Sequence, residues 1–405
     1  MTSSTLTPPS LVASAPAAAR AVFQLMKGLK YGMLQIQLPD GGTLQFGSAE
    51  GTELRATIRL RNWNACAAAL KSGDIGFAES FIAGDWTTPD LTDLLTLFIA
   101  NRDEVERMIY GSWWGALLYR VKHLLNRNSR RGSAKNIHAH YDLGNEFYRL
   151  WLDPTMNYSS AWFEGDRAGD LVQAQRAKVR RALAECGVGR GDRVLEIGCG
   201  WGALAESAAR DFGAHVTGVT LSREQLAWGQ QRLADARLPG ELRYQDYRDI
   251  ADGPFDAVAS IEMFEAVGRE YWPSFFETLR TQLKPGGKAC IQSITIHDDL
   301  FERYVKSTDF IQQYIFPGGL LPSPGAFRAA AAKAGLKVIN ELDFGFDYAE
   351  TLKRWRARFL AADGPVRALG FDTRFMRIWE FYLGYCEAAF ATRNTSVMQF
   401  TLQRD

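Results

Sequence analysis

The second half of the chain alternates short hydrophobic runs with longer stretches of helical spacing. The runs that predict strands are 193–197, 215–219, 241–244, 255–260, 287–296, 336–344 and 396–402. Helices between consecutive strands cover both faces of a sheet, so this alternation predicts an α/β domain with a mostly parallel sheet. Three segments interrupt the alternation, namely 136–163, 297–335 and 347–394, and such insertions commonly carry substrate sites.

The first part of the chain shows a different pattern. Residues 34–38 and 43–46 alternate hydrophobic and polar positions on either side of a Pro-Asp-Gly-Gly turn, which predicts a β-hairpin. The elements expected after it are a strand at 56–60 and helices at 63–70, 76–83 and 91–99. We therefore predict a small α+β domain over residues 21–120.

A stretch at the end of this domain combines apolar and basic residues. Residues 108–125 carry aromatic and aliphatic side chains at helical spacing, and no acidic residue lies between Arg120 and Lys135. Such a pattern suits an anionic membrane surface, which favours a lipid- or membrane-associated first domain. The alternative is a core-facing helix followed by a solvated linker, and the pattern alone leaves both open.

Length and composition refine the domain boundaries. A chain of 405 residues exceeds the size at which one core usually stops growing, so two domains are expected. Residues 1–20 are rich in Ser, Thr, Pro and Ala and lack the apolar core of a signal peptide, so they predict a disordered leader. We expect a basic linker over 121–136 and the second domain over 137–405.

Charge and cysteine content exclude several classes of protein. The formal net charge of +1 predicts no bulk attraction to nucleic acid. The five cysteines are scattered without a C-x-x-C pair, which argues against a disulfide framework or structural zinc and fits a reducing cytoplasm. His138 and His140 have no third ligand nearby, so no metal is expected. No apolar run approaches the roughly 18–20 residues that span a bilayer.

The most informative motif is the stretch Val-Leu-Glu-Ile-Gly-Cys-Gly-Trp-Gly at 194–202. A buried strand that carries Glu196 is followed by Gly198, Gly200 and Gly202. Glycine allows a tight turn and lets a ligand lie against the backbone. The pattern resembles motif I of the S-adenosylmethionine methyltransferases, and the alternative is a tight strand–helix turn without a ligand.

Polar residues follow the next two predicted strands. Thr220 and Gln225 stand where many nucleotide-binding folds place a group that binds ribose hydroxyls. Ser222 between them is a good N-cap for the helix that follows. Asp246 and Tyr247 follow the third strand, where an acid can bind the amino group of adenine. The candidate cofactor ligands of this region are therefore Thr220, Gln225, Asp246 and Tyr247.

Further motifs occur in one order along nearly the whole chain. They lie at 140–145, 152–154, 156–161, 218–220, 245–249, 263–268 and 346–348. Together with the glycine loop, this set resembles the cyclopropane-fatty-acyl-phospholipid synthase family, which includes the mycolic acid cyclopropane synthases. The resemblance implies a Rossmann-like, seven-stranded class I methyltransferase domain behind a small N-terminal α+β domain. It also implies that Tyr158 and Ser159 touch the carboxylate end of the cofactor.

The resemblance implies transfer of a methylene group from S-adenosylmethionine to a cis double bond of a phospholipid acyl chain. A bound bicarbonate ion is expected to remove the proton that allows the ring to close. Glu265, Tyr348 and the backbone N–H of Ile294 match residues that hold it. The family's usual cysteine and histidine are Ser160 and Gln292 here, and both can still donate hydrogen bonds.

Several expectations remain open at this point. Cys386 matches a cysteine sometimes labelled catalytic in the family, although an isolated helical cysteine is usually a small core residue. The altered base site leaves a methyl- or methylene-branched product as an alternative to the ring. A small-molecule N-methyltransferase and a lipid-binding protein with a relict cofactor site are the other hypotheses. We expect a phospholipid bilayer as partner, a possible homodimer, and a cytoplasmic protein at the inner face of the membrane.

Overall fold

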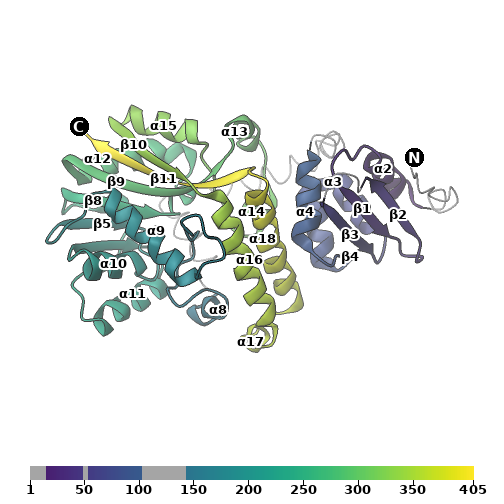
Figure 1. Cartoon of the computed structure of the whole chain (residues 1–405), viewed down its shortest axis with the longest axis horizontal. Helices are drawn as coiled ribbons and strands as arrows, with labels where there is room; N and C mark the ends of the chain where they lie inside the picture. Colours follow the sequence, from purple (N-terminus) through teal and green to yellow (C-terminus); the bar gives the residue numbers. More distant parts are fainter. Residues whose placement is uncertain (1–14, 49–52, 103–142) are drawn as a thin grey trace. The chain divides into compact units, whose positions relative to one another are not determined.

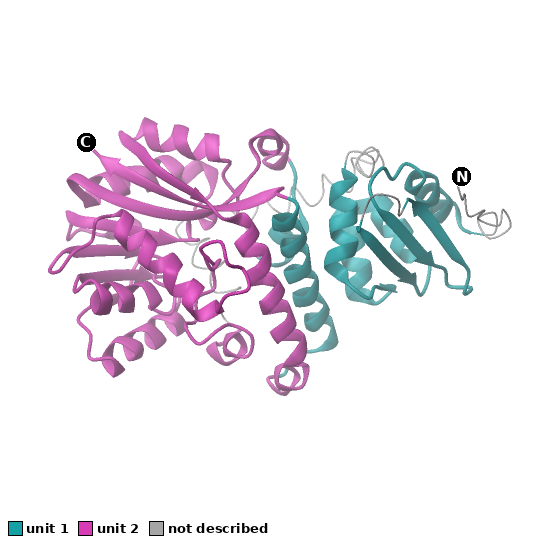
Figure 2. Cartoon of the chain, viewed as in Figure 1, with its two compact units in different colours: residues 1–123, 307–315, 370–392 teal, residues 124–306, 316–369, 393–405 magenta. Residues whose placement is uncertain are grey.

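The computed structural model describes residues 15–48, 53–102 and 143–405. The chain forms two compact units (Figure 2). Unit 1 comprises 1–123, 307–315 and 370–392, and unit 2 comprises 124–306, 316–369 and 393–405. Unit 1 therefore includes two segments from the part of the sequence that we assigned to the second domain.

Unit 1 is built around a four-stranded sheet in the order β2-β1-β3-β4. Its strands are β1 (Met33–Gln37), β2 (Thr43–Gly47), β3 (Arg55–Leu60) and β4 (Trp86–Thr87). Strands β1 and β2 pair in antiparallel fashion across the predicted turn, which confirms the hairpin, while β3 lies parallel to β1. Side chains alternate between buried and more exposed along β1 and β2, as the sequence pattern requires.

The helices of unit 1 come from distant parts of the sequence. They are α2 (Ala17–Met26), α3 (Asn64–Ala83), α4 (Leu91–Ala100), α14 (Phe310–Tyr314) and α18 (Thr373–Ala391). Helix α3 has a kink at Ser72 and Gly73, so the two helices predicted at 63–70 and 76–83 are its two halves. Helix α2 starts within the expected leader, because residues 17–20 are helical.

Unit 2 contains a seven-stranded sheet in the order β10-β11-β9-β8-β5-β6-β7 (Figure 1). Its strands are β5 (Arg193–Ile197), β6 (His215–Thr220), β7 (Glu241–Tyr244), β8 (Phe255–Ile261), β9 (Leu283–Ile296), β10 (Leu336–Asp343) and β11 (Thr395–Arg404). Strands β5 to β9 are parallel, whereas β11 runs antiparallel to both β9 and β10. The α/β fold with seven strands is thus confirmed.

Helices cover both faces of this sheet. The α-helices of unit 2 are α8 (Asn145–Arg149), α9 (Leu171–Glu185), α10 (Ala203–Asp211), α11 (Arg223–Asp235), α12 (Trp272–Gln282), α13 (Asp298–Tyr304), α15 (Pro324–Lys333), α16 (Gly345–Ala361) and α17 (Asp363–Ala368). Its short 3₁₀ turns are η1 (Tyr247–Asp249), η2 (Phe264–Ala266) and η3 (Arg269–Tyr271). Neighbouring residues of one strand enter different cores: Val194 packs with α9 and α10, and Leu195 packs with α12 and α15. This two-sided burial explains the continuous hydrophobic runs of the sequence.

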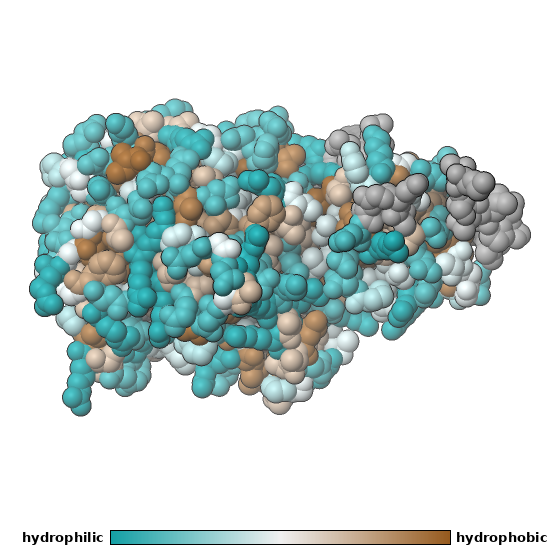
Figure 3. Space-filling model, in the orientation of Figure 1, coloured by the Kyte–Doolittle hydropathy of each residue, from teal (hydrophilic) through white to brown (hydrophobic). Residues whose placement is uncertain are grey.

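The segment 108–125, for which we considered a membrane surface, lies outside the described residues. Within the described part of the chain, no helix is long and apolar enough to cross a membrane. The face shown in Figure 3 is mostly hydrophilic, with hydrophobic residues in separate areas. Among the described residues, the exposed large hydrophobic side chains are Tyr31, Tyr244, Ile339, Phe346, Leu360 and Leu369.

Candidate active site

A cavity opens at the carboxyl ends of the parallel strands of unit 2, where ligands bind in open α/β sheets. Its lining includes nine of the ten predicted cofactor ligands, all except Gly202. These nine are Tyr158, Ser159, Glu196, Gly198, Gly200, Thr220, Gln225, Asp246 and Tyr247. The structure therefore brings together residues that lie far apart in the sequence.

The glycine loop forms one wall of this cavity. The backbone N–H groups of Gly198 and Cys199 both donate to the carbonyl of Val219, at 2.9 and 3.0 Å. Gly200 has a φ of +49°, and a Cβ there would enter open space. Gly202 has a φ of +81°, and its Cβ would lie 3.1 Å from the Cα of Gly229. The loop thus needs glycine both for its turns and for close packing of α10 on α11.

Glu196, at the end of β5, lines the cavity with a buried side chain. Its Oε2 atom has no hydrogen-bond partner among the described residues. Burial raises the pKa of this carboxyl well above its usual range. A buried acceptor without a partner is suited to a donor group on a bound ligand.

Thr220, Ser222 and Gln225 form a local network at the start of α11. Ser222 accepts from the backbone N–H of Gln225 at 3.3 Å, which confirms it as the N-cap. The hydroxyl of Thr220 donates to Oε1 of Gln225 at 3.2 Å and accepts from the backbone N–H of Ser222. This network fixes both candidate ligands at the cavity wall.

Asp246 and Tyr247 lie in the turn after β7. The carboxylate of Asp246 accepts from Nε of Arg248 at 2.8 Å. Burial raises the pKa of Tyr247 to about 12, so its phenol stays protonated at neutral pH.

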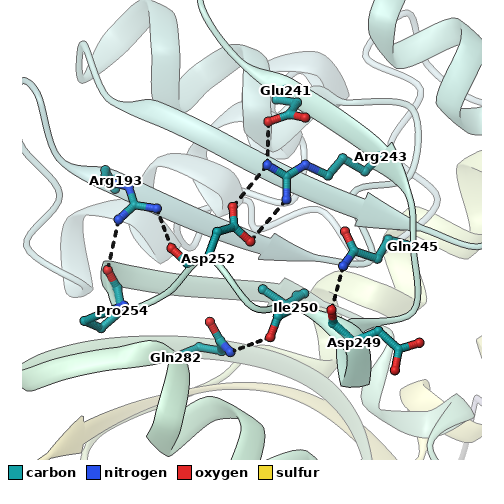
Figure 4. A network of polar contacts seen from close by, with 9 residues as sticks. All are labelled: Arg193, Glu241, Arg243, Gln245, Asp249, Ile250, Asp252, Pro254 and Gln282. Carbon is teal, nitrogen blue, oxygen red and sulfur yellow. Dashed lines mark hydrogen bonds and ion pairs between the residues drawn. The ribbon is translucent and has the colours of Figure 1, made fainter.

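Figure 4 shows how the chain on either side of this turn is held. Arg243 binds Glu241 and Asp252, and Gln245 donates to the carbonyl of Asp249 at 2.9 Å. Gln282 of α12 donates to the carbonyl of Ile250 at 3.0 Å. The turn that carries Asp246 and Tyr247 is therefore tied to the neighbouring strand and helix.

A second group of side chains surrounds Glu262, which directly follows β8. Glu262 Oε1 accepts from the backbone N–H of Ser160 at 2.9 Å and from Nε2 of Gln292 at 2.7 Å. Its Oε2 accepts from the hydroxyl of Tyr348 at 2.7 Å. We call these four residues the Glu262 cluster. Three of the residues predicted to bind an anion thus donate to a carboxylate of the chain itself.

Glu265 lies on η2, one turn after Glu262. Its Oε1 accepts from the backbone N–H of Ile294 and from the hydroxyl of Ser293. Burial and then the nearby charge of Glu262 raise the pKa of Glu265 to about 8. Glu265 is therefore largely protonated at neutral pH, beside an acid that accepts three hydrogen bonds.

Lys178 of α9 is fully buried. Its Nζ donates to the hydroxyl of Ser159 and lies 3.4 Å from Oδ1 of Asn157. Burial lowers the pKa of Lys178 to about 8, and the charges of Glu262 and Asp153 act against that shift. A buried cation beside Ser159 places positive charge next to the cavity.

Aromatic rings border the same region. Tyr158, which lines the cavity, has its ring centroid 5.6 Å from that of Trp355. Trp355 in turn meets Tyr348 edge to face at 6.1 Å. Ring faces at this position can stabilise a positive charge on a bound molecule.

Cys386 is the remaining residue that the resemblance marks as catalytic. It lies on α18 in unit 1, whereas the Glu262 cluster lies in unit 2. Burial raises the pKa of its thiol far above the usual range, so the neutral thiol is the favoured form.

Glu262 and Lys178 were not predicted from the sequence. Glu262 stands directly after a predicted strand, and that position is a usual one for ligand-binding residues in α/β sheets. Lys178 carried no such signal, because a lysine on a predicted helix is normally solvated. His138 and His140, for which we expected no metal, lie outside the described residues.

Comparisons with known proteins place the chain in a family. The family model of mycolic acid cyclopropane synthetase matches residues 128–400. A tuberculostearic acid methyltransferase of Mycobacterium tuberculosis is 41% identical over 347 residues, which are 83% of this chain and 80% of that protein. The cyclopropane-fatty-acyl-phospholipid synthase of Escherichia coli (strain K12) is 34% identical over 356 residues, 86% of this chain and 88% of that protein.

A solved structure extends the similarity to three dimensions. The mycolic acid cyclopropane synthase CmaA1, crystallised in complex with SAH and CTAB, matches with a TM-score of 0.63 and 34% identity. The match covers 67% of this chain and 98% of that chain.

Proposed function

We propose that this chain, which belongs to the mycolic acid cyclopropane synthetase family, methylates a cis double bond in a fatty acyl chain of a phospholipid. It is an S-adenosylmethionine-dependent methyltransferase, and its relatives act on lipids. The observation that supports the acyl substrate is that the glycine loop, the ring of Tyr158 and the carboxylate of Glu262 line one cavity.

The residues around the cavity fit S-adenosylmethionine. Glu196 offers a buried acceptor without a described partner, and the open space above Gly200 lets a ligand approach the backbone. Ser159, with Lys178 behind it, is suited to the carboxylate end of the cofactor. When bound, the cofactor supplies an electrophilic methyl group on a sulfonium.

The side chains of this chain have to guide a poor nucleophile. An unactivated alkene reacts only if its carbons are held in line with the methyl group in a site that excludes water. Addition of the methyl group leaves a positive charge on the neighbouring carbon of the acyl chain. We assign stabilisation of this charge to the ring of Tyr158, which lines the cavity and packs against Trp355.

Two products follow from loss of different protons. Loss of a proton from the new methyl group closes a cyclopropane ring, which is the first candidate. Loss of a proton from the acyl chain gives a branched, unsaturated product. The second outcome is favoured by the 41% identity to a protein named as a methyltransferase rather than as a cyclopropane synthase.

The bicarbonate ion expected from the resemblance does not fit the described residues. Tyr348, Gln292 and Ser160, which were to hold it, all donate to Glu262. The N–H of Ile294 donates to Glu265, and the hydroxyl of Ser160 donates to the carbonyl of Ala161 at 2.9 Å. A free anion at this position would also lie against the carboxylate of Glu262.

The test is incubation of the full chain with methyl-labelled S-adenosylmethionine and vesicles of unsaturated phospholipid. We expect label in the acyl chains, and none when the vesicles contain only saturated chains. Proton NMR of the lipid then separates ring hydrogens from alkene hydrogens. Label in a soluble amine but not in the lipid would overturn the proposal in favour of an N-methyltransferase.

The membrane partner and the oligomeric state remain parts of this proposal. Flotation of the chain with anionic vesicles tests peripheral association with a bilayer. Analytical ultracentrifugation tests the homodimer.

A further inference from the structure

We propose that the carboxylate of Glu262 is the catalytic base of this enzyme and stands in place of the expected bicarbonate ion. The inference rests on the proposed function, because the base acts on the methylated acyl chain. It assigns to the protein itself a proton acceptor that the resemblance attributed to a bound ion.

The geometry around Glu262 is that of an anion site. The three donors come from separate segments: the loop before α9, strand β9 and helix α16. All three donor–acceptor distances lie between 2.7 and 2.9 Å, the normal range for hydrogen bonds to a carboxylate. Donors that converge from different elements hold the carboxylate in one position.

The orientation of the Gln292 amide is itself fixed. Its Oε1 accepts from Nε2 of Gln399 at 3.0 Å, so its Nε2 points at Glu262. Gln399 on β11 is held in turn by Arg181, which donates to its Oε1 at 2.7 Å. Gln292 and Gln399 are both fully buried. This chain of amides makes the donor to Glu262 a fixed part of the sheet.

The backbone at Glu262 adds a second, independent observation. Its φ is +49°, in the left-handed region that favours glycine. A non-glycine residue there costs on the order of 1 kcal/mol. The backbone geometry would be satisfied by glycine, yet this position carries a carboxylate at the centre of the cluster. Strain of this kind, when observed, is concentrated at functional sites.

The charges near Glu262 and its position at the cavity also suit a base. Burial raises the pKa of Glu262 above its usual range, and the charge of Lys178 acts against this shift by favouring the ionised form. An ionised carboxylate with a raised pKa is a better base than a solvated one. Glu262 also lines the cavity that holds the glycine loop and Tyr158, so a bound acyl chain can reach it.

The reaction step balances without another reagent. The π electrons of the alkene form the new carbon–carbon bond, and the electron pair of the broken sulfur–methyl bond stays on sulfur. The adjacent acyl carbon is left as a cation. Glu262 accepts a proton, and the released C–H pair either closes the three-membered ring or forms a carbon–carbon double bond. Glu262 later returns the proton to solvent.

Two variants separate this role from a structural one. Glu262→Gly suits the local φ and opens space for an anion, whereas Glu262→Gln fills the space with an amide that cannot accept the proton. We expect both to lose roughly 100-fold in methylation rate in buffer free of carbon dioxide. We expect bicarbonate or formate to restore activity at least tenfold in Glu262→Gly only, and to leave the unmodified chain unchanged.

Three measurements make the outcome decisive. Calorimetry should show that S-adenosylmethionine binds both variants as it binds the unmodified chain, and urea unfolding should show that both variants are folded and unfold cooperatively. Bicarbonate titrated by ¹³C NMR should bind Glu262→Gly and not the unmodified chain. Bicarbonate-dependent activity or bicarbonate binding in the unmodified chain would overturn the assignment, as would full activity of Glu262→Gln. Absence of lipid methylation by the unmodified chain would instead contradict the proposed function, while the bicarbonate titration still tests the anion site.

Discussion

Each unit of the protein contains a pair of partly buried acidic side chains, and the two pairs differ in what surrounds them. In unit 1, Asp74 accepts from the hydroxyl of Tyr385 at 3.2 Å, and Asp309 caps helix α14. In unit 2, Glu262 and Glu265 lie side by side after β8. In both pairs, burial and the neighbouring carboxylate raise a pKa, to about 7 for Asp309 and about 8 for Glu265.

The difference lies in the use of the carboxylate oxygens. Those of Asp309 satisfy the backbone of α14 in a capping box with Gln312. Glu262 instead gathers donors from three distant segments and faces a cavity. A raised pKa alone therefore marks burial, whereas convergent donors at a cavity indicate chemistry.

The largest difference in methylation rate is expected between two matched tyrosine variants, one in each unit. Tyr348→Phe removes a donor to Glu262, and we expect methylation to fall by roughly 100-fold because the base loses its position. Tyr385→Phe removes a donor to Asp74, and we expect an unchanged rate with a loss of about 1 kcal/mol in unfolding free energy. Initial rates and urea unfolding check both; an equal fall in rate for the two variants would erase the distinction between the pairs.

A smaller effect is expected within the pair of unit 2. Glu265 is largely protonated at neutral pH, and an amide oxygen can still accept from the N–H of Ile294. We therefore expect Glu265→Gln to stay within about tenfold of the normal rate, far above Glu262→Gln. Parallel rate measurements decide the point. If the methylation rate fell equally in Glu265→Gln and Glu262→Gln, the reaction would require the ionised form of Glu265.

Stability against pH gives a third comparison. Both Asp309 and Glu265 have a folded pKa above the unfolded value, so the folded chain holds more protons between the two values. Stability is therefore highest at low pH in this window and falls as pH rises from about 4 to about 8. Asp309→Asn keeps a good cap, and Glu265→Gln keeps the acceptor, yet neither titrates.

Urea unfolding at several pH values measures this slope. We expect each single variant to reduce the slope of unfolding free energy against pH, and the double variant to reduce it further. A slope unchanged in the double variant would show that other groups cause the pH dependence.

The smallest effects on rate and stability are expected from substitution of two glutamines, one in each unit. Gln399→Ala releases the amide of Gln292, and we expect the methylation rate to fall about fivefold as the donor to Glu262 loosens. Gln312→Ala removes half of a capping box in unit 1 and is expected to cost about 1 kcal/mol without changing the rate. Rates and unfolding midpoints, measured side by side, test the pair. An unchanged rate in Gln399→Ala would show that Gln292 is oriented without it.

Much of the fold could be predicted from the sequence, because hydrophobic periodicity reflects local geometry. Strands β5 and β7 have the predicted bounds, and the remaining strands of the large sheet differ from prediction only at their ends. The packing of 307–315 and 370–392 into unit 1 was not predicted, since it depends on contacts between segments far apart in the chain.

The site was predicted less completely than the fold. The glycine loop carries its own local signal, so Gly198 and Gly200 were found directly. The resemblance pointed to Ser160, Gln292 and Tyr348 as donors but to a different acceptor. That all three point at Glu262 follows only from the three-dimensional arrangement, because no spacing in the sequence relates them.

The position of β11 has a consequence for the order of assembly. This strand inserts between β9 and β10, and it brings Gln399 to the amide that orients Gln292. A folding intermediate with only the parallel strands paired would already possess the glycine loop. Such an intermediate would lack the bond by which Gln399 orients Gln292, so its glycine loop would form before the proton acceptor is held in position.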